Sequence, residues 1–215
     1  MTHGHLPRPK DRSDVAGVAL MVMVIAGIQL LLPESVTIGP VWAIPALELL
    51  GIPVGLIATQ WGPLVSMRFR PAVGVYLAFL VAASVLNASL LFIGLLRGAS
   101  ESADALLFAG FGVLVINVLS FALVYWWMDS GGPLARATAT NEDRDFLFPQ
   151  QGFDHSTWQP RIWDYCFTAY TNIIAFSPTD TMPLTHRAKG LFTIQSSVSL
   201  VTILVTLSRA INLIP

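Results

Sequence analysis

The sequence predicts an all-α protein: a polytopic transmembrane bundle of about five helices plus one short re-entrant or pore-type helix. Of the 215 residues, 54% are apolar and 12% are charged, whereas soluble domains carry about 25% charged residues. The mean hydropathy is +0.65. About half of the chain lies in apolar stretches long enough to cross a bilayer core of about 30 Å: Val15–Leu32, Val41–Ala58, Ala72–Leu96, Ala105–Met128 and Gly190–Ile214.

The composition also excludes several classes of protein. The formal net charge is −1, so we expect no nucleic acid or other polyanion as a partner. Cys166 is the one cysteine, which excludes a disulfide-stapled scaffold. The expected partner is the lipid bilayer, and neither a soluble enzyme nor a disordered chain fits.

The N-terminal region predicts a cytoplasmic tail over residues 1–14, followed by a retained helix. The tail is polar and basic, as in a signal peptide. However, the apolar run continues as far as Pro33 and Glu34 without a small-x-small cleavage pattern. We therefore interpret this run as the first of four helices in a transmembrane region over residues 15–128.

The second apolar stretch differs from the others in that prolines and a carboxylate interrupt it. Pro45 and Pro53 flank Glu48, and a charge at membrane depth costs about 2.5–3.5 kcal/mol on insertion scales. We therefore predict that Glu48 faces the bundle interior, as a candidate ion contact. Residues 59–71, which include Arg68 and Arg70, are expected to form a loop.

The third and fourth stretches predict uninterrupted spans. Asn87 and Asn117 lie inside them, where amides more often tie helices together than bind a substrate. Tyr125, Trp126 and Trp127 end the fourth span as an interfacial aromatic anchor. The following run, Asp129-Ser130-Gly131-Gly132-Pro133, should end the helix, because Gly and Pro do not continue it.

The C-terminal part predicts a polar loop over 129–160 and a pore-module-like unit over 161–215. The loop is too small for an independent domain. The apolar stretch 162–174 is too short for an ordinary span and suits a re-entrant helix. Pro178 should break the chain after it, so that 175–185 forms an irregular segment before the last helix.

The last helix carries a polar stripe with spacings of three and four residues. Such a stripe faces neighbouring helices or water, because lipid offers no hydrogen-bond partners. Two interpretations stay open: the stripe lines a pore or cavity, or its side chains bond to other helices. Its members are Gln195, Ser199, Thr202, Thr206 and Arg209.

The segment before this helix resembles the end of the potassium-channel pore loop. The resemblance rests on Asp180-x-x-Pro183, on Thr185, and on aromatic and hydroxyl residues in the short helix. It implies a pore-like architecture with Ser177, Thr179 and Asp180 as ion-contact candidates. Ser177 and Thr179 replace the filter glycines and Pro178 replaces the tyrosine, so potassium selectivity does not carry over. Asp180 either binds a cation or caps the turn.

A longer part of the chain resembles an uncharacterised bacterial membrane-protein family. The matching motifs are Tyr125-Trp126-Trp127-Met128-Asp129-Ser130-Gly131-Gly132-Pro133, Phe146-Leu147-Phe148-Pro149-Gln150, and Ala175-Phe176-Ser177-Pro178-Thr179-Asp180. This resemblance covers about 90 residues. It implies a multi-pass protein of the inner cell membrane and brings no established activity.

The positions of the basic residues predict the orientation. With a cytoplasmic N-terminus and a re-entrant 162–174, Arg97 lies outside, while the other Lys and Arg residues that precede the last helix lie inside, a strong positive-inside pattern. The re-entrant segment would then enter from the cytoplasmic face, and the C-terminus would lie outside. A full crossing by 162–178 places Arg187 and Lys189 outside and weakens the pattern.

Two functions follow from these patterns. One is a permeation protein, oligomeric, with 175–185 at a constriction and an unidentified cation as the permeant species. The other is a non-conducting membrane protein that binds or organises a partner through the 129–160 loop. Paired carboxylates, nucleotide loops and nucleophile–base patterns are not found at membrane depth, so we expect no enzyme, cofactor or metal.

Overall fold

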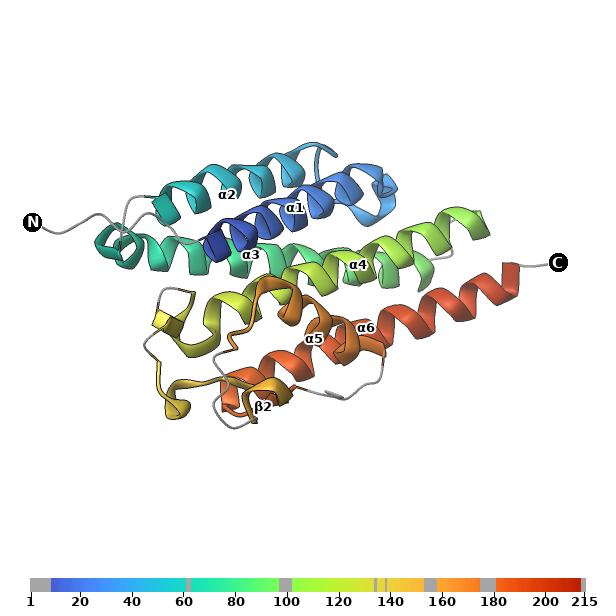
Figure 1. The fold of residues 1–215 in the computed structure, drawn as a ribbon. Helices are drawn as coiled ribbons and strands as arrows, with labels where there is room; N and C mark the ends of the chain where they lie inside the picture. Colours follow the sequence, from blue (N-terminus) through green and yellow to red (C-terminus); the bar gives the residue numbers. More distant parts are fainter. Residues whose placement is uncertain are drawn as a thin grey trace, which may run out of the picture.

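The computed structural model describes residues 9–60, 63–96, 102–133, 135–137, 139–152, 158–174 and 181–213. In this part of the chain the fold is all-helical (Figure 1). Its α-helices are α1 (Pro9–Leu31), α2 (Ala43–Gln60), α3 (Pro63–Leu96), α4 (Ala103–Met128), α5 (Ile162–Ile174) and α6 (His186–Leu213).

Four of these helices are long and apolar enough to cross a membrane, as expected for an integral membrane protein. Their apolar segments are Asp14–Leu31, Arg70–Gly94, Asp104–Gly131 and His186–Ser208. The second predicted span corresponds to α2, whose apolar helix in the searched residues is shorter, Ala43–Pro53.

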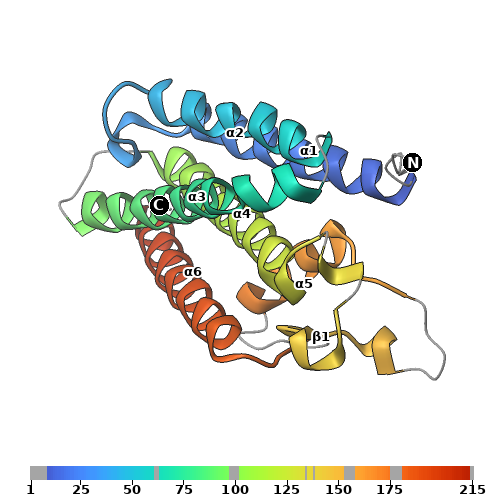
Figure 2. The ribbon, with the colours of Figure 1, turned by 90° about the vertical axis from the view of Figure 1, so that its left-hand side faces the viewer.

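Helix α4 is the centre of the bundle. It packs against α1, α3, α5 and α6, while α2 covers α1 and α3 on one side (Figure 2). In its apolar segment 61% of the residues are buried within the fold, against 28% in α6. Much of α6 therefore presents apolar side chains outward, as a helix in lipid does.

The helices alternate between two ends of the bundle. At the first, which we call the loop end, the starts of α1, α5 and α6 meet the end of α4: Asp14 accepts a hydrogen bond from the Ile162 N–H, and Tyr165 and Arg187 reach the residues that follow α4. The far end carries the ends of α1 and α3 and the starts of α2 and α4 (Figure 1). Helix α6 runs from the loop end to the far end (Figure 1).

Local sequence signals explain both ends of α4. The Ser102 hydroxyl caps its start by accepting a hydrogen bond from the Ala105 N–H at 3.2 Å. At its other end Ser130, Gly131 and Gly132 have φ values of 53°, 79° and 101°, a left-handed conformation in which glycine is favoured. The predicted stop after Met128 is confirmed.

The prediction of a loop over 59–71 is wrong for every residue of this range that the structure describes, because α2 extends to Gln60. Helix α3 begins at Pro63 and runs through Pro71, so Arg68 and Arg70 are helical. A proline in the first position of a helix loses no hydrogen bond, because that N–H has no helical partner. Pro71 lies inside the same helix, where it has no N–H to donate to the helical hydrogen bonds.

Helix α6 also begins earlier than the predicted span. It starts at His186 instead of Gly190. The Thr185 hydroxyl accepts a hydrogen bond from the Ala188 N–H at 3.3 Å, which caps the first turn. The predicted span did not include this first turn, because Arg187 and Lys189 are charged and the span was defined by its apolar residues.

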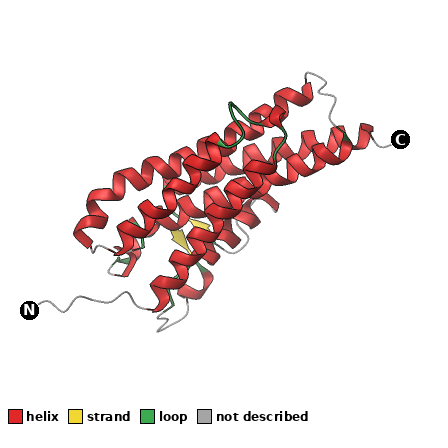
Figure 3. Ribbon diagram, turned by 90° about the horizontal axis from the view of Figure 1, so that it is seen from above, coloured by secondary structure: helices red, strands yellow, loops and turns green. Residues whose placement is uncertain are grey.

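The loop after α4 is built from short turns and one strand. Four 3-10 turns occur in its described residues: η2 (Asp129–Gly131), η3 (Ala135–Ala137), η4 (Asn141–Asp143) and η5 (Pro149–Gly152). Strand β1 (Phe146–Leu147) pairs antiparallel with β2 (Met182–Pro183), Phe146 opposite Pro183. Figure 3 shows these strands in yellow among the helices. The all-α prediction did not include this pair, which fastens the segment after α5 to the loop after α4.

Candidate functional site

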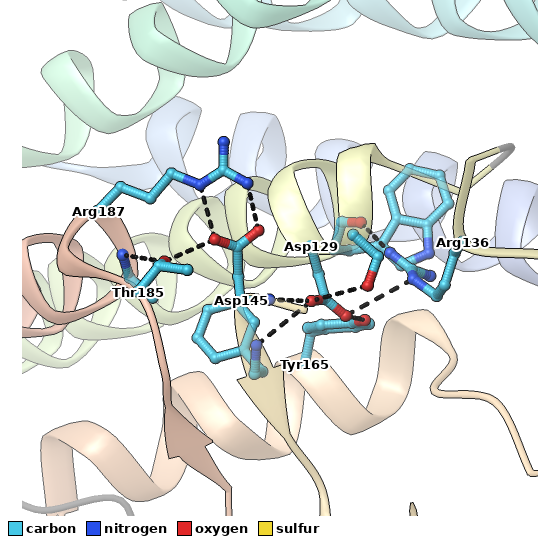
Figure 4. A network of polar contacts seen from close by, with 10 residues as sticks. Asp129, Arg136, Asp145, Tyr165, Thr185 and Arg187 are labelled. Carbon is cyan, nitrogen blue, oxygen red and sulfur yellow. Dashed lines mark hydrogen bonds and ion pairs between the residues drawn. The ribbon is translucent and has the colours of Figure 1, made fainter. Parts of the chain in front are cut away.

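The Asp129 carboxylate, directly after α4, is the centre of a buried polar network. Its exposed fraction is 1%. Oδ1 accepts hydrogen bonds from the backbone N–H groups of Asp145 (2.9 Å) and Phe146 (3.3 Å). Oδ2 accepts one from the Tyr165 hydroxyl at 2.5 Å. One carboxylate thus connects the end of α4, strand β1 and helix α5 (Figure 4).

Arg136 supplies the positive charge beside this carboxylate. Its Nε lies 3.6 Å from Asp129 Oδ2, and its guanidinium lies 5.0 Å from the centre of the Tyr165 ring. The same guanidinium donates to the Trp126 carbonyl at 2.5 Å. That carbonyl belongs to the last turn of α4, where the helix no longer supplies donors.

A second carboxylate, Asp145, joins the loop to the start of α6. It is fully buried. The Arg187 guanidinium donates bidentate hydrogen bonds to it, from Nε to Oδ1 at 2.6 Å and from Nη2 to Oδ2 at 2.5 Å. The Thr185 hydroxyl donates to it at 2.6 Å, and its backbone carbonyl accepts from the Leu184 N–H at 2.8 Å. Bidentate Arg–carboxylate pairs of this kind are strong and geometrically specific.

These contacts describe an anchoring network. Two carboxylates face two guanidinium groups, so the charges of the four side chains cancel. Every oxygen of both carboxylates has a hydrogen bond or ion pair. A buried network in which every carboxylate oxygen is engaged holds these segments together.

A second polar cluster lies deeper in the bundle, around Gln195 of α6. Its Oε1 accepts hydrogen bonds from the Tyr125 hydroxyl (2.7 Å) and the Asn172 amide (2.8 Å), and its Nε2 donates to the Ala169 carbonyl (3.1 Å). Gln195 and Tyr125 are both fully buried. Tyr125 is therefore a core residue bonded to α6, and the prediction that it is an interfacial anchor is wrong.

The polar stripe of α6 faces other helices of the same chain. The Ser199 hydroxyl donates to Asn117 of α4 at 3.2 Å, and the Thr202 hydroxyl donates to the backbone of its own helix. Thr206 is buried against Gly110 of α4. The two helices approach so closely there that a Cβ atom at residue 110 would overlap the Thr206 side chain. Gln195 and Ser199 thus make the interhelical bonds of the second interpretation; the Arg209 side chain lies outside the described residues.

The two asparagines of the third and fourth spans do tie helices together, as predicted. Asn87 of α3 and Gln29 of α1 exchange hydrogen bonds at 3.2 and 2.7 Å. Asn117 accepts from Ser199 of α6. Each pair joins helices that lie far apart in the sequence, and in a membrane such bonds contribute about 0.6 kcal/mol on average.

Glu48 is buried inside the bundle, as predicted from its flanking prolines. Its exposed fraction is 0%, and neither carboxyl oxygen has a hydrogen-bond partner. Its backbone carbonyl accepts from the Tyr76 hydroxyl of α3 at 2.7 Å. This carboxyl lies in the α1–α2–α3 part of the fold, apart from the Asp129 network.

The predicted constriction falls largely outside the described residues. Ser177, Thr179 and Asp180 all belong to 175–180, which the structure does not describe. On the N-terminal side of these residues, α5 ends at Ile174, which is before Pro178 as predicted. The chain is described again from Thr181, whose hydroxyl lies 3.0 Å from that of Thr168 in α5.

The sequence did contain a signal for the anchoring network. Asp129 and Asp145 stand out in a chain with few acidic residues, and Asp129 directly precedes a glycine turn. The signal was interpreted as a helix stop alone. Pairing with Arg136 was not predictable because the intervening Gly-Gly turn sets the path of the chain, and pairing of Asp145 with Arg187 spans 42 positions that include α5.

The described residues include no group of three or more His, Cys, Asp or Glu side chains that could hold a metal ion. No protein-family model, curated protein or solved structure matches this chain.

Asp129→Asn should destabilise the fold strongly. The variant keeps the shape but leaves the Arg136 guanidinium without its buried counter-charge, and removing one partner of a buried pair costs about 3–5 kcal/mol. Chemical unfolding in detergent measures this loss. Glu142→Gln, which changes an exposed carboxylate of the same loop, is the control; equal stability of the two variants would contradict the anchoring role.

Gln195→Leu should also destabilise the protein, although leucine suits an apolar bundle. It leaves the Tyr125 hydroxyl without an acceptor and the Asn172 amide with one bond fewer, at about 1–3 kcal/mol for each unsatisfied buried group. Thermal unfolding in detergent tests this, with Ser197→Ala at an exposed position of α6 as the control. A leucine variant as stable as the parent would show that the cluster contributes no net stability.

Proposed function

We propose that this chain is a multi-pass permeation protein in which α5 and residues 175–185 enter the membrane from the loop end and return to it. The observation that carries this proposal is the length and placement of α5. Its 13 residues span about 20 Å at 1.5 Å per residue, less than a hydrocarbon core of about 30 Å.

The neighbours of α5 support a return to the same side. Its first residue, Ile162, bonds to Asp14 at the start of α1. The chain after it pairs with β1, which hydrogen-bonds to Asp129. Helix α6 then begins beside Asp145. A half-depth helix with both flanks at one end is the geometry of a re-entrant segment.

The outer face of α5 supports its insertion into lipid. It carries large apolar and aromatic side chains that are 51–57% exposed: Trp163, Phe167, Tyr170 and Ile174. The opposite face holds Tyr165, Thr168 and Asn172 in polar contacts with the rest of the fold. A contiguous apolar face of this kind needs lipid or another protein chain as its cover.

The positions of charged side chains support an orientation with the loop end in the cytoplasm. All described Lys and Arg side chains lie at that end, and at the far end Glu34 and Asp104 are exposed. By the positive-inside rule the N-terminus is then cytoplasmic and α6 ends outside. Helix α2 has 18 residues, about 27 Å, and as a fifth span it returns the chain from the far end to the start of α3.

An oligomer is part of this proposal. One re-entrant loop per chain surrounds a pore only when several copies share a symmetry axis. The ions that pass would meet Ser177, Thr179 and Asp180, and the cation is unidentified.

A specific observation favours the alternative, a non-conducting protein that organises a partner. Gln195 and Ser199, which would line a pore, are fully buried and bonded within one chain. The described part of the loop after α4 is tied to α4 and α6 through Asp129 and Asp145, and a partner would bind this loop at the cytoplasmic end.

Cysteine labelling tests the re-entrant arrangement. In a Cys166→Ala background, single cysteines replace the exposed residues Arg161, Lys189 and Ile38. We expect a membrane-impermeant maleimide to reach Arg161→Cys and Lys189→Cys from one side of sealed vesicles and Ile38→Cys from the other. Labelling of Arg161→Cys and Lys189→Cys from opposite sides would show that the segment between them crosses the membrane.

Ion flux into liposomes tests permeation itself. The purified protein should pass a monovalent cation under an imposed potential of one polarity or the other, and Asp180→Asn should reduce this flux because it removes a negative charge from the proposed path. Glu142→Gln is the matched control. Folded protein with no flux under either polarity, together with a monomeric state, would leave the partner-binding alternative.

A further inference from the structure

The buried carboxyl groups among the described residues have two different kinds of surroundings. Asp129 and Asp145 are each surrounded by hydrogen-bond donors and an arginine. Glu48 is equally buried, with an exposed fraction of 0%, but neither of its oxygens has a hydrogen-bond partner. It lies on α2, which packs against α1 and α3.

Among the side chains that the structure describes on the neighbouring helices, none brings a positive charge to Glu48. From α3, Tyr76 reaches it, but the Tyr76 hydroxyl donates to the Glu48 backbone carbonyl and not to the carboxyl. The other titratable side chains described on α1 and α3 are engaged at the loop end: Asp14 with the start of α5 and Arg70 over Trp127. Glu34, on the 3-10 turn η1 (Glu34–Val36) between α1 and α2, is exposed.

These surroundings favour a proton over a metal ion as the species bound to Glu48. An ionised carboxylate without donors is strongly disfavoured in an apolar interface, and taking up a proton removes the charge. A metal cation such as Ca²⁺ needs about six to eight oxygen ligands, and Glu48 belongs to no cluster of acidic side chains among the described residues.

We propose that Glu48 is a proton-binding site within the α1–α2–α3 part of the bundle. Its carboxyl is held there as the neutral acid, and losing the proton requires water to enter between α2 and its neighbours. The site stands independently of the proposed permeation function, because it depends only on the packing of these three helices.

Infrared difference spectroscopy of the reconstituted protein tests this site directly. We expect the carbonyl stretch of a protonated carboxylic acid at neutral pH and its complete loss in Glu48→Gln. Glu34→Gln, which removes an exposed carboxyl, should leave the band unchanged. Glu48→Asp should retain an acid band, because it keeps the carboxyl group.

Two results would overturn the proposal. The first is a spectrum at neutral pH in which Glu48→Gln removes a carboxylate band and no acid band, since the group is then ionised. The second is loss of the acid band when Na⁺ is added at constant pH, because Na⁺ would then displace the proton as the ligand. Neither readout measures ion flux, so failure of this proposal and failure of the permeation proposal are distinguishable.

The coupling to water is tested by hydrogen–deuterium exchange. As the pH is raised, the backbone of α2 should exchange faster in the parent protein than in Glu48→Gln, since only the parent acquires a charge that draws in water. Equal exchange of the two proteins across the pH range in which the acid band disappears would contradict the coupling.

Discussion

The Asp129 carboxylate holds together segments that would otherwise have no reason to meet. It lies where α4 has ended and its last carbonyls lack donors, and it accepts hydrogen bonds from the first residues of β1 and from Tyr165 of α5. Because β1 is positioned in this way, Asp145 faces Arg187 and sets where α6 begins. Asp129 therefore positions β1 and the first turns of α5, and its burial makes this dependence strong, since a buried carboxylate that lost its donors would be costly.

The position of α5 within the bundle has a separate cause. Its first turns are tied to Asp129, but its last turns meet Gln195 through Asn172 and the Ala169 carbonyl. Gln195 also accepts from Tyr125, so one amide connects the three helices α4, α5 and α6. In an apolar environment the alternative to such a bond is an unsatisfied polar group. The cluster therefore fixes the position and angle of α5 relative to α4 and α6 more specifically than a purely apolar contact would.

The polar residues of the spans illustrate how one pattern allows two functions. The stripe from Gln195 to Thr206 has the spacing of a pore-lining face, yet its described hydrogen bonds all stay within the chain: those to other helices involve Asn117, Tyr125, Ala169 and Asn172, and Thr202 bonds to its own helix. Glu48 shows the reverse case: a carboxyl that needs a partner and has none. Hydrogen-bond contacts distinguish the polar side chains that join helices from a carboxyl group such as Glu48. The spacing of polar residues along the sequence does not show which contacts they make.

The sequence by itself determined the features that depend on neighbouring residues: the class of protein from its apolar stretches, the bounds of α5, the end of α4 at a Gly-Gly turn, and the inward orientation of Glu48 between its prolines. Only the tertiary structure decided which groups pair. Tyr125 became a core residue because Gln195, far along the chain, offers it an acceptor. Arg68 lies in a helix and not in the predicted loop, because α3 begins at Pro63 and continues through Pro71. These outcomes depend on distances between segments remote in sequence, whereas hydropathy and turn signals act within a few residues.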